Sequence, residues 1–204
     1  MIILDVVQNS PEWFEARMGI PTASSFDKII TSTGKPSTQA KSYMNKLLAE
    51  WLTGESDSIK QNEWMERGHE LEGQARSLYG FLNDCEPKQV GLIYKDDRKL
   101  VSCSPDSLLD DKGHEIKCPA PHTHVEYLLA DKLPTKYKIQ VQGSMYVTGL
   151  DKWVFQSFHP TMPSLILEVG RDEKLIKSID EGLNNFIDEM LEKREQLKQL
   201  KDAA

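Results

Sequence analysis

Three short runs of β-branched and other apolar residues lie close together in the middle of the chain, and they constrain the fold more than any other feature. The runs cover residues 90–94, 99–105 and 114–119, and Asp, Lys and Gly residues separate them. Runs of this length and composition predict a meander of β-strands joined by turns. Two further runs, 152–158 and 165–170, predict strands nearer the C-terminus. We therefore expect a β-sheet at the centre of the protein.

Helical patterns lie on both sides of these strands. Ser10 and Pro11 predict the start of a short helix, because serine caps helices and proline fits their first turn, and Gly19 is placed to end it. A second helix is expected to begin near Ser24 or Ser25. Apolar residues at helical spacing predict further helices over 37–52, 62–82, 136–149 and from residue 172 onward. This order predicts an α/β fold, a central mixed β-sheet flanked by helices.

Two of the expected helices have a clear apolar face. In the helix over 62–82 the face consists of Trp64, Leu71, Ala75, Leu78 and Leu82. In the last helix it consists of Leu175, Ile179, Leu183, Phe186 and Met190. Residues three and four apart share one side of a helix, so we expect both faces to pack against the rest of the protein.

The length of 204 residues fits a single domain over residues 1–204. A content of 39% hydrophobic and 28% charged residues is typical of globular proteins rather than disordered or membrane ones. No window approaches the roughly 18 apolar residues of a membrane span, and the N-terminal apolar run lacks a basic flank. We expect no membrane association and a cytoplasmic location.

Cysteine content and net charge exclude some kinds of site. The cysteines are Cys85, Cys103 and Cys118, an odd number without a C-x-x-C pair, which favours reduced thiols over disulfides, zinc or iron–sulfur centres. The net charge of −7 argues against DNA binding by general attraction, because Lys and Arg supply most non-specific affinity. If DNA is bound, the positive charge must be concentrated locally.

The pattern with the most chemical content is Asp106, followed after eight residues by Glu115-Ile116-Lys117. Asp106 ends one expected strand, and residues 110–113 supply the turn into the next. Side chains alternate along a strand, so Glu115 and Lys117 should share a face while Ile116 points into the core. Carboxylates are ligands that Mg²⁺ prefers, and a nearby lysine can orient water or stabilise charge on a phosphate, or accept a proton if its pKa is lowered. This chemistry suits phosphodiester hydrolysis; the alternative is an ordinary surface hairpin with a salt-bridged lysine.

Two further polar residues lie on expected helices. Glu72 lies at the margin of the buried face of its helix, where it either serves an active site or pairs with Arg76, four residues on. Gln140 shares one helical face with Tyr137 and Ser144. It either contacts a phosphate or a catalytic water, or belongs to a solvated surface.

A third cluster consists of Arg17, Thr22, Ser24 and Ser25. The hydroxyls fall where a helix is expected to begin, a position that favours anions, and arginine offers a fork of donors. The cluster therefore predicts either a terminal-phosphate pocket, or plain helix capping by Ser24 or Ser25 with Arg17 at the surface.

Six segments in this order resemble the lambda-exonuclease, or YqaJ-type, family of phage recombination nucleases, within the restriction-endonuclease-like group. The resemblance covers most of the chain. The segments are 15–30 (EARMGIPTASSFDKII), 65–79 (MERGHELEGQARSLY), 101–109 (VSCSPDSLL), 114–121 (HEIKCPAP), 137–149 (YKIQVQGSMYVTG) and 171–174 (RDEK).

The resemblance implies a restriction-endonuclease-like core and a role for each matching residue. It implies metal binding by Asp106, Glu115 and the carbonyl of Ile116, with Mg²⁺ as the metal and Mn²⁺ able to replace it. The catalytic lysine falls on Lys117. The family's upstream active-site glutamate falls on Glu72.

Three more positions carry roles that the resemblance implies. The glutamine that helps to position the water falls on Gln140, and the 5′-phosphate pocket falls on Arg17 and Ser24. The turn between the metal-binding aspartate and glutamate is one residue shorter than in the lambda enzyme, and other loops differ as well.

The resemblance further implies 5′→3′ digestion of one strand of double-stranded DNA from a 5′-phosphorylated end. The products would be 5′-mononucleotides and a 3′ single-stranded overhang for homologous recombination by strand annealing. The implied assembly is a ring-shaped homotrimer, and the implied partner is a phage single-strand annealing protein. A protein of this kind is encoded by a phage or prophage and acts in the bacterial cytoplasm.

Two other functions are compatible with the same residues. A structure-specific or site-specific DNA endonuclease would share Asp106, Glu115 and Lys117 but would not need a phosphate pocket. A non-catalytic DNA-binding or annealing module would bind DNA without Mg²⁺ and release no nucleotides.

Overall fold

The computed structural model describes residues 1–56 and 63–203, without the side chains of 63–67 and 69. Asn62, the first residue of the helix expected over 62–82, lies outside the described residues, as do the side chains of Trp64 and Met65. Within the described part the helices are α1 (Pro11–Arg17), the 3₁₀ helix η1 (Ala23–Lys28), α2 (Ala40–Thr53), α3 (Glu63–Asn83), α4 (Pro121–Ala130), α5 (Thr135–Thr148) and α6 (Glu173–Asp202). The strands are β1 (Ile2–Leu4), β2 (Leu92–Tyr94), β3 (Ser102–Cys103), β4 (Ser107–Leu108), β5 (Gly113–Lys117), β6 (Lys152–Ser157) and β7 (Leu165–Gly170).

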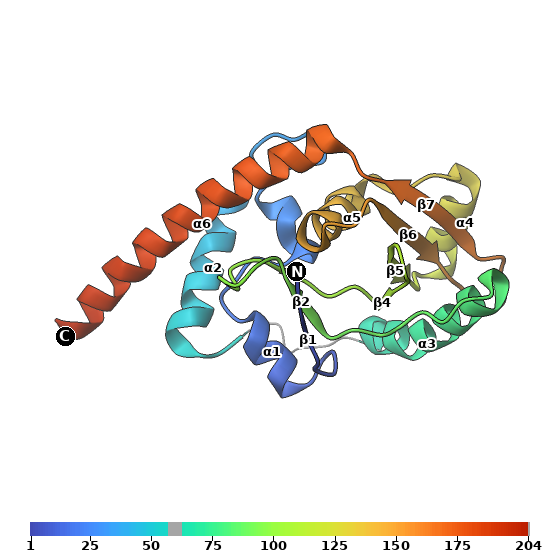
Figure 1. Cartoon of the computed structure of the whole chain (residues 1–204), viewed down its shortest axis with the longest axis horizontal. Coiled ribbons are helices and arrows are strands. Elements are labelled where there is room, and N and C mark those ends of the chain that lie inside the picture. The colour runs from blue at the N-terminus through green and yellow to red at the C-terminus, as the bar shows by residue number, and fades with distance from the viewer. Residues whose placement is uncertain (57–62, 204) are drawn as a thin grey trace.

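The strands form two small sheets, one in the order β1-β2-β3 and one in the order β4-β5-β6-β7. In the second sheet β5 pairs with β6 in parallel, whereas the β4–β5 and β6–β7 pairs are antiparallel, so this sheet is mixed. Helices α3, α4 and α5 surround this second sheet (Figure 1). The predicted α/β fold with a mixed sheet flanked by helices is confirmed. The single meander predicted from the three central runs is wrong, because β5 pairs with β4 and β6 and does not follow β3 in a sheet.

Pro105 explains why the expected strand over 99–105 is divided. Proline has no backbone N–H to donate to a ladder, so a strand tends to stop there. Residues on the two sides of Pro105 join different sheets, β3 pairing with β2 and β4 pairing with β5. Asp106, directly after the proline, is thereby carried to the edge of β5.

Helix α5 is the central helix of the fold. It packs against strands of both sheets and against η1 and α6, and its residues from Val141 to Thr148 are all buried. The close contact with η1 needs Gly143, because a Cβ there would lie 2.5 Å from Cδ2 of Phe26. The alternative of a solvated face through Ser144 is wrong, since Ser144 is buried.

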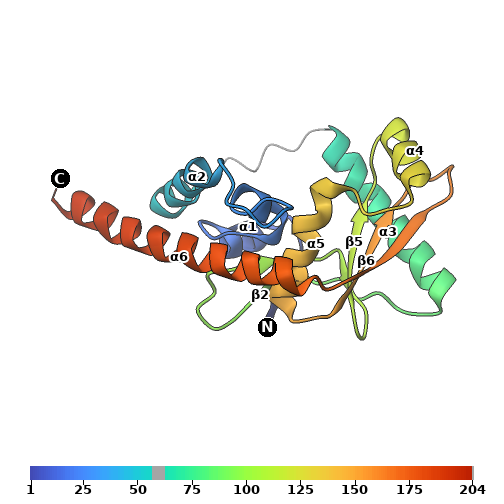
Figure 2. The same ribbon diagram turned by 90° about the horizontal axis from the view of Figure 1, so that it is seen from above.

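Helix α6 packs its inner half on α2 and α5 and extends beyond the body of the protein (Figure 2). The predicted apolar face of this helix is confirmed, because all five of its residues are buried. Among the described residues, no helix is long and apolar enough to cross a membrane.

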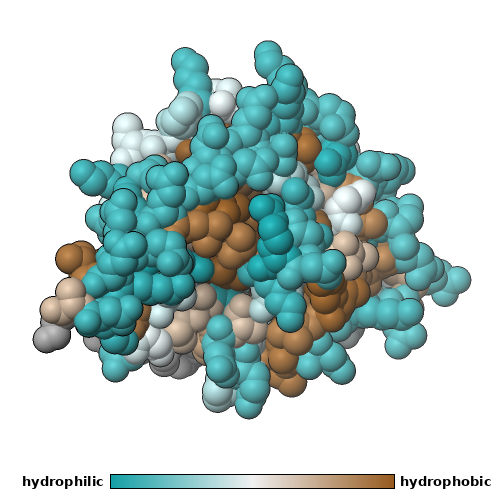
Figure 3. Space-filling view, turned by 60° about the vertical axis from the view of Figure 1, so that its left-hand side comes forward, coloured by the Kyte–Doolittle hydropathy of each residue, from teal (hydrophilic) through white to brown (hydrophobic). Residues whose placement is uncertain are grey.

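An apolar groove of about 430 Å³ lies between α2 and the outer half of α6. Leu48, Leu52, Leu197 and Leu200 line it, and Leu200 remains 68% exposed. Figure 3 turns this side of the molecule forward and shows hydrophobic surface in a hollow between hydrophilic side chains. Exposed apolar surface of this kind is uncommon on a protein that acts alone.

The start of η1 differs from the sequence-based expectation. The 3₁₀ helix begins at Ala23, and Thr22 is its capping residue without a side-chain cap hydrogen bond. Capping by Ser24 or Ser25 is therefore wrong. The hydroxyl of Ser24 lies 3.1 Å from that of Thr22 instead.

Candidate active site

Asp106 lies at the point where β4 begins beside β5. Its backbone N–H donates to the carbonyl of His114 at 3.1 Å, and its Oδ2 accepts from the N–H of Ile116 at 2.5 Å. The N–H and C=O of one strand residue point to the same edge of the strand. The carbonyl of Ile116 therefore faces the edge at which the Asp106 carboxylate lies.

Glu115 and Lys117 share a face of β5, as their spacing predicts. Nζ of Lys117 donates to Oε1 of Glu115 at 2.5 Å, and Nε2 of Gln140 from α5 donates to the same oxygen at 2.5 Å. Between them, Ile116 points to the opposite side and packs against Leu71. The predicted convergence of two carboxylates and a lysine is confirmed, and Gln140 reaches the same carboxylate.

The electrostatics of this cluster disfavour two negative charges. Burial raises the pKa of Asp106 to about 6, with Glu72 adding to the rise while Lys117 opposes it. Burial also raises the pKa of Glu115 to about 7, again against the effect of Lys117. Burial alone would lower the pKa of Lys117, but the carboxylates of Glu115 and Asp106 outweigh it and raise that pKa. The lysine is therefore an ammonium, and a further cation would relieve the crowding of the acids.

The oxygen atoms of this site suit Mg²⁺. Mg²⁺ commonly takes one or two carboxylates and fills its remaining positions with other oxygens, including water. The Asp106 and Glu115 carboxylates and the carbonyl of Ile116 are oxygen donors of this kind. Within the described residues, no three His, Cys, Asp or Glu side chains gather into a group that could hold a metal ion.

Helix α3 contributes two charged residues to the surroundings of Asp106. Glu72 is partly buried and lies close enough to Asp106 to raise its pKa. Nη2 of Arg76, one turn later, donates to the backbone carbonyl of Asp106 at 3.1 Å. The sequence suggested Arg76 only as a partner of Glu72, and its contact with Asp106 was missed. The sequence signal for this contact is the position of Arg76 four residues after Glu72, which places both side chains on the same side of the helix.

A buried hydrogen-bond network behind Glu115 was also not predicted from the sequence. Nδ1 of His114 lies 3.1 Å from the hydroxyl of Ser107, and its Nε2 lies 2.9 Å from Oε1 of Gln156. Nε2 of Gln156 donates in turn to the carbonyl of Ala75. Burial lowers the pKa of His114 to about 4, so the ring is neutral. The network ties β4, β5, β6 and α3 together and fixes the strand that carries Glu115 and Lys117.

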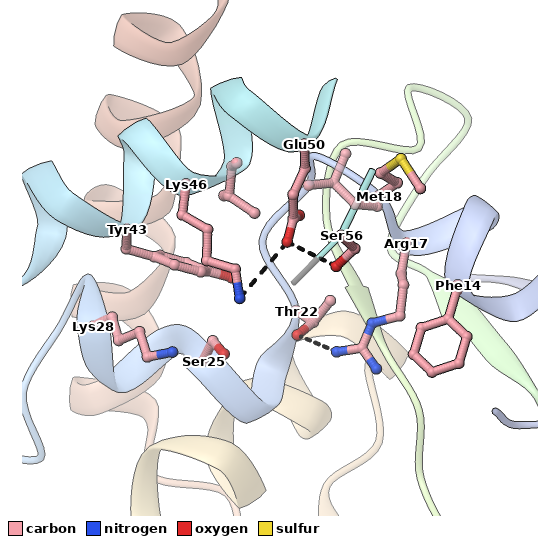
Figure 4. Close-up of a pocket in the computed structure, with 12 residues that line it drawn as sticks. Phe14, Arg17, Met18, Thr22, Ser25, Lys28, Tyr43, Lys46, Glu50 and Ser56 are labelled. Carbon is pink, nitrogen blue, oxygen red and sulfur yellow. Dashed lines mark hydrogen bonds and ion pairs between the residues drawn. The ribbon is translucent and has the colours of Figure 1, made fainter. Parts of the chain in front are cut away.

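The Arg17 cluster borders a cavity of about 240 Å³ (Figure 4). Nη2 of Arg17 donates to the hydroxyl of Thr22 at 3.2 Å, and its guanidinium lies 4.0 Å from the centre of the Trp13 ring. Burial lowers the pKa of Arg17, so its charge is poorly solvated and an anion would be a favourable partner.

The lining of this cavity differs in part from the predicted cluster. Ser25, Lys28 and Lys46 line it, whereas Ser24 does not and is exposed. Glu50 adds one acidic group, which Lys46 approaches at 3.7 Å. The cavity thus offers three cations and the hydroxyls of Thr22, Ser25, Tyr43 and Ser56 against one carboxylate, which suits an anion such as phosphate.

The chain is similar to known proteins both in sequence and in fold. Residues 12–151 match the family model of the YqaJ-like viral recombinase domain. The fold is similar to that of an alkaline exonuclease from Laribacter hongkongensis, with a TM-score of 0.85 and 31% identity over 95% of this chain and 99% of that one. The structure of the same enzyme in complex with dAMP gives a TM-score of 0.84, 32% identity and the same coverage of both chains.

More distant relatives share less. A phage-related exonuclease from Haemophilus somnus 129PT has the same fold, with a TM-score of 0.69 and 18% identity over 89% of this chain and 96% of that one. A protein of Acanthamoeba polyphaga mimivirus is 28% identical over 109 residues, which are 47% of this chain and 20% of the mimivirus protein. The chain therefore spans about a fifth of the length of that relative. The likeness to the alkaline exonuclease confirms the expected restriction-endonuclease-like core.

Proposed function

The chain belongs to the YqaJ-like viral recombinase domain family, and we propose that it is a Mg²⁺-dependent 5′→3′ exonuclease on double-stranded DNA. The observation that carries this proposal is the cluster in which Lys117 and Gln140 both contact Oε1 of Glu115, with Asp106 beside them. The similar enzyme from Laribacter hongkongensis is an alkaline exonuclease with a dAMP complex. A nucleoside monophosphate is the product expected of such an enzyme.

Each residue of the cluster has a chemical task in this proposal. Asp106, Glu115 and the Ile116 carbonyl would hold Mg²⁺, which when bound supplies positive charge against the phosphate and makes an attacking water more acidic. The ammonium of Lys117 stabilises the negative charge that develops on the phosphate oxygens. The amide of Gln140 holds the Glu115 carboxylate and lies where it can orient the water.

The Arg17 cavity gives a reason for digestion from a 5′ end. Attack of water on phosphorus breaks the bond to the 3′ oxygen of the terminal nucleotide, which takes up a proton and leaves as part of a 5′-mononucleotide. The shortened strand then carries a new 5′-phosphate. Arg17, Lys28 and Lys46 can hold this phosphate as they held the one before it. The opposite strand remains as a 3′ overhang, the substrate for a phage single-strand annealing protein.

We further propose a homotrimer as the working assembly. The apolar groove between α2 and α6 supports contact with another copy, because Leu52 and Leu200 are exposed there. A sedimentation mass of one chain at micromolar concentration would contradict the trimer without affecting the active-site assignment.

The decisive experiment is a timed digestion of linear duplex DNA that carries a 5′-phosphate and an internal label. We expect mononucleotides and a growing 3′ overhang in Mg²⁺, and no product in EDTA. Efficient cutting of covalently closed circular duplex would instead support an endonuclease. Duplex binding without any nucleotide release in Mg²⁺ or Mn²⁺ would support a non-catalytic DNA-binding module.

Replacing Arg17 with alanine is expected to slow digestion of 5′-phosphorylated duplex by about 10- to 100-fold, since a charge-assisted contact to phosphate is lost. Release of the first nucleotide from duplex with a 5′-hydroxyl should proceed at an almost unchanged rate, because that strand gains a 5′-phosphate only after the first cleavage. Rates of first-nucleotide release from the two substrates measure the effect. Arg98→Ala is the matched control, because Arg98 forms only an exposed pair with Asp96 at 3.6 Å. An equal loss on both kinds of end would argue against a phosphate pocket.

A further inference from the structure

A second cavity, of about 450 Å³, lies between the end of α4 and the start of α5. Tyr127, Lys132, Thr135 and Lys136 are among the residues that line it. Figure 2 shows the loop that joins the two helices, and Lys132 and Pro134 of this loop also line the cavity. Neither lysine comes within 4.0 Å of a carboxylate in the part of the chain that the structure describes. Two cations without carboxylate partners are notable in a chain with a net charge of −7.

The ring of Tyr137 connects this cavity with the active site. The ammonium of Lys136 lies 5.0 Å from the centre of that ring, and the ammonium of Lys117 lies 5.4 Å from the same centre. One ring thus has Lys117 and Lys136 as neighbours, and an aromatic ring attracts both ammonium groups. An anion next to the one at the active site would neutralise the charge of Lys136.

Tyr127 offers a further donor at this place. The residue is 5% exposed, and its hydroxyl is buried without a hydrogen bond among the described residues. Lys136 and Tyr137 approach this hydroxyl as side-chain hydrogen-bond neighbours, but neither contact has the geometry of a full hydrogen bond. A buried hydroxyl with poorly oriented neighbours loses part of its hydrogen-bond free energy. An acceptor in the cavity would give it a well-oriented partner.

The start of α5 adds to the positive potential of the cavity. Pro134 is the capping residue, and no side chain caps the helix. A helix of 14 residues carries partial positive charge at this end. The two lysines, the phenol and the helix start outweigh the one carboxylate of the lining, that of Glu126, and together suit a phosphate group rather than a neutral ligand.

We propose that Lys136, with Tyr127 and Lys132, binds the backbone phosphate next to the one that is cleaved. This inference rests on the proposed nuclease function for its substrate and assigns a second contact point to the same DNA strand. It also places locally concentrated positive charge beside the acidic active site. Lys117 then faces the cleaved phosphate, and Lys136 faces its neighbour across the Tyr137 ring.

The test is Lys136→Ala, compared with Lys138→Ala on the same helix. Lys138 is the matched control because the carboxylate of Asp172 engages it at 3.2 Å. Duplex binding is measured by fluorescence anisotropy in EDTA at several salt concentrations. We expect Lys136→Ala to weaken binding about tenfold at low salt and to reduce the slope of log K against log salt by roughly 0.9. Lys136→Arg should restore the slope.

Kinetics in Mg²⁺ give an independent measure. Lys136→Ala should raise KM about tenfold and leave kcat within about twofold, because a contact made before and during the reaction is lost. An unchanged salt slope in a variant with a wild-type melting temperature would overturn the proposal. An equal change in Lys138→Ala, or a fall in kcat with unchanged binding, would also overturn it.

Failure of the proposed nuclease function gives a different pattern. If wild-type protein released no nucleotide but Lys136→Ala still reduced the salt slope, the phosphate contact would stand and the hydrolytic reaction would not. The binding measurement needs no metal, so the two conclusions are separable.

Discussion

Replacing Lys117 with alanine is expected to lower the rate of DNA hydrolysis by on the order of 10³-fold, with DNA binding largely kept. The Lys117 ammonium lies 2.5 Å from Oε1 of Glu115 and beside Asp106, so it stands where negative charge develops on the phosphate. No other lysine or arginine is within ion-pair distance of Glu115 in the described part of the chain. Single-turnover rates on end-labelled duplex in Mg²⁺ measure the loss.

The variant should still fold, because Glu115 can respond to the loss of its partner. Burial already raises the pKa of Glu115 to about 7. Without Lys117 the carboxyl can take up a proton, and the Gln140 amide still donates to it. Thermal melting is therefore expected to show at most a modest change.

Lys112→Ala is the matched control for this variant. Lys112 lies in the turn of the same hairpin and pairs with the half-exposed carboxylate of Glu168 at 2.8 Å. Removing it should leave turnover within about twofold, since exposed ion pairs contribute little. Near-normal turnover of Lys117→Ala, in protein that melts like wild type, would refute the role of Lys117.

The central part of the active site could be predicted because it depends on local geometry. Glu115 and Lys117 alternate with Ile116 along one strand, and alternation fixes which side chains share a face. The position of Gln140 on a helix could also be predicted from the sequence. Its contact with Glu115 could not be predicted, because that contact depends on how α5 packs across the sheet.

Other parts of the fold depend on contacts between residues that are far apart in the sequence. The division at Pro105 sends β3 and β4 into different sheets, and the choice of partner strand is a tertiary effect. Helix α4 was not predicted, although Pro121 at its first turn is a usual start signal. Its sequence of 10 residues is too short for a clear apolar periodicity.

The buried polar network could not be predicted from the sequence for a similar reason. His114 contacts Ser107 and Gln156 because β4 and β6 flank β5, and the spacing of these residues along the chain does not indicate the contacts. Arg17 and Ser24 illustrate the opposite case. Their neighbourhood in sequence suggested one pocket, but the Ser24 hydroxyl contacts that of Thr22, while Ser25, Lys28 and Lys46 border the cavity.

Replacing Asp106 with asparagine is expected to lower hydrolysis by about 10³-fold or more and to make the metal-free protein more stable. The activity falls because a carboxylate ligand worth several kcal/mol in the transition state is lost. The stability rises because Asp106 lies beside Glu115 and near Glu72, and burial together with these charges disfavours its ionised form. The amide oxygen of asparagine can still accept from the N–H of Ile116.

In EDTA, we expect the melting temperature of Asp106→Asn to exceed that of wild type by about 2–4 °C, the shift that about 1 kcal/mol gives in a chain of this size. Asp111→Asn is the control, since Asp111 is exposed in the adjacent turn. Differential scanning fluorimetry in EDTA and in Mg²⁺ compares the three proteins.

Addition of Mg²⁺ separates metal binding from simple charge removal. A ligand that binds only the folded protein raises the free energy of unfolding by RT ln(1 + [L]/Kd), and the melting temperature rises with it. Wild type and Asp111→Asn should therefore gain stability in Mg²⁺, whereas Asp106→Asn should gain little because one carboxylate of the donor set is missing. If Mg²⁺ raised the melting temperature of all three equally, the metal would be bound elsewhere. If Asp106→Asn were less stable than wild type in EDTA, the hydrogen bond from Ile116 to the carboxylate would outweigh the crowding of the acidic groups. The expected gain in stability would then be refuted.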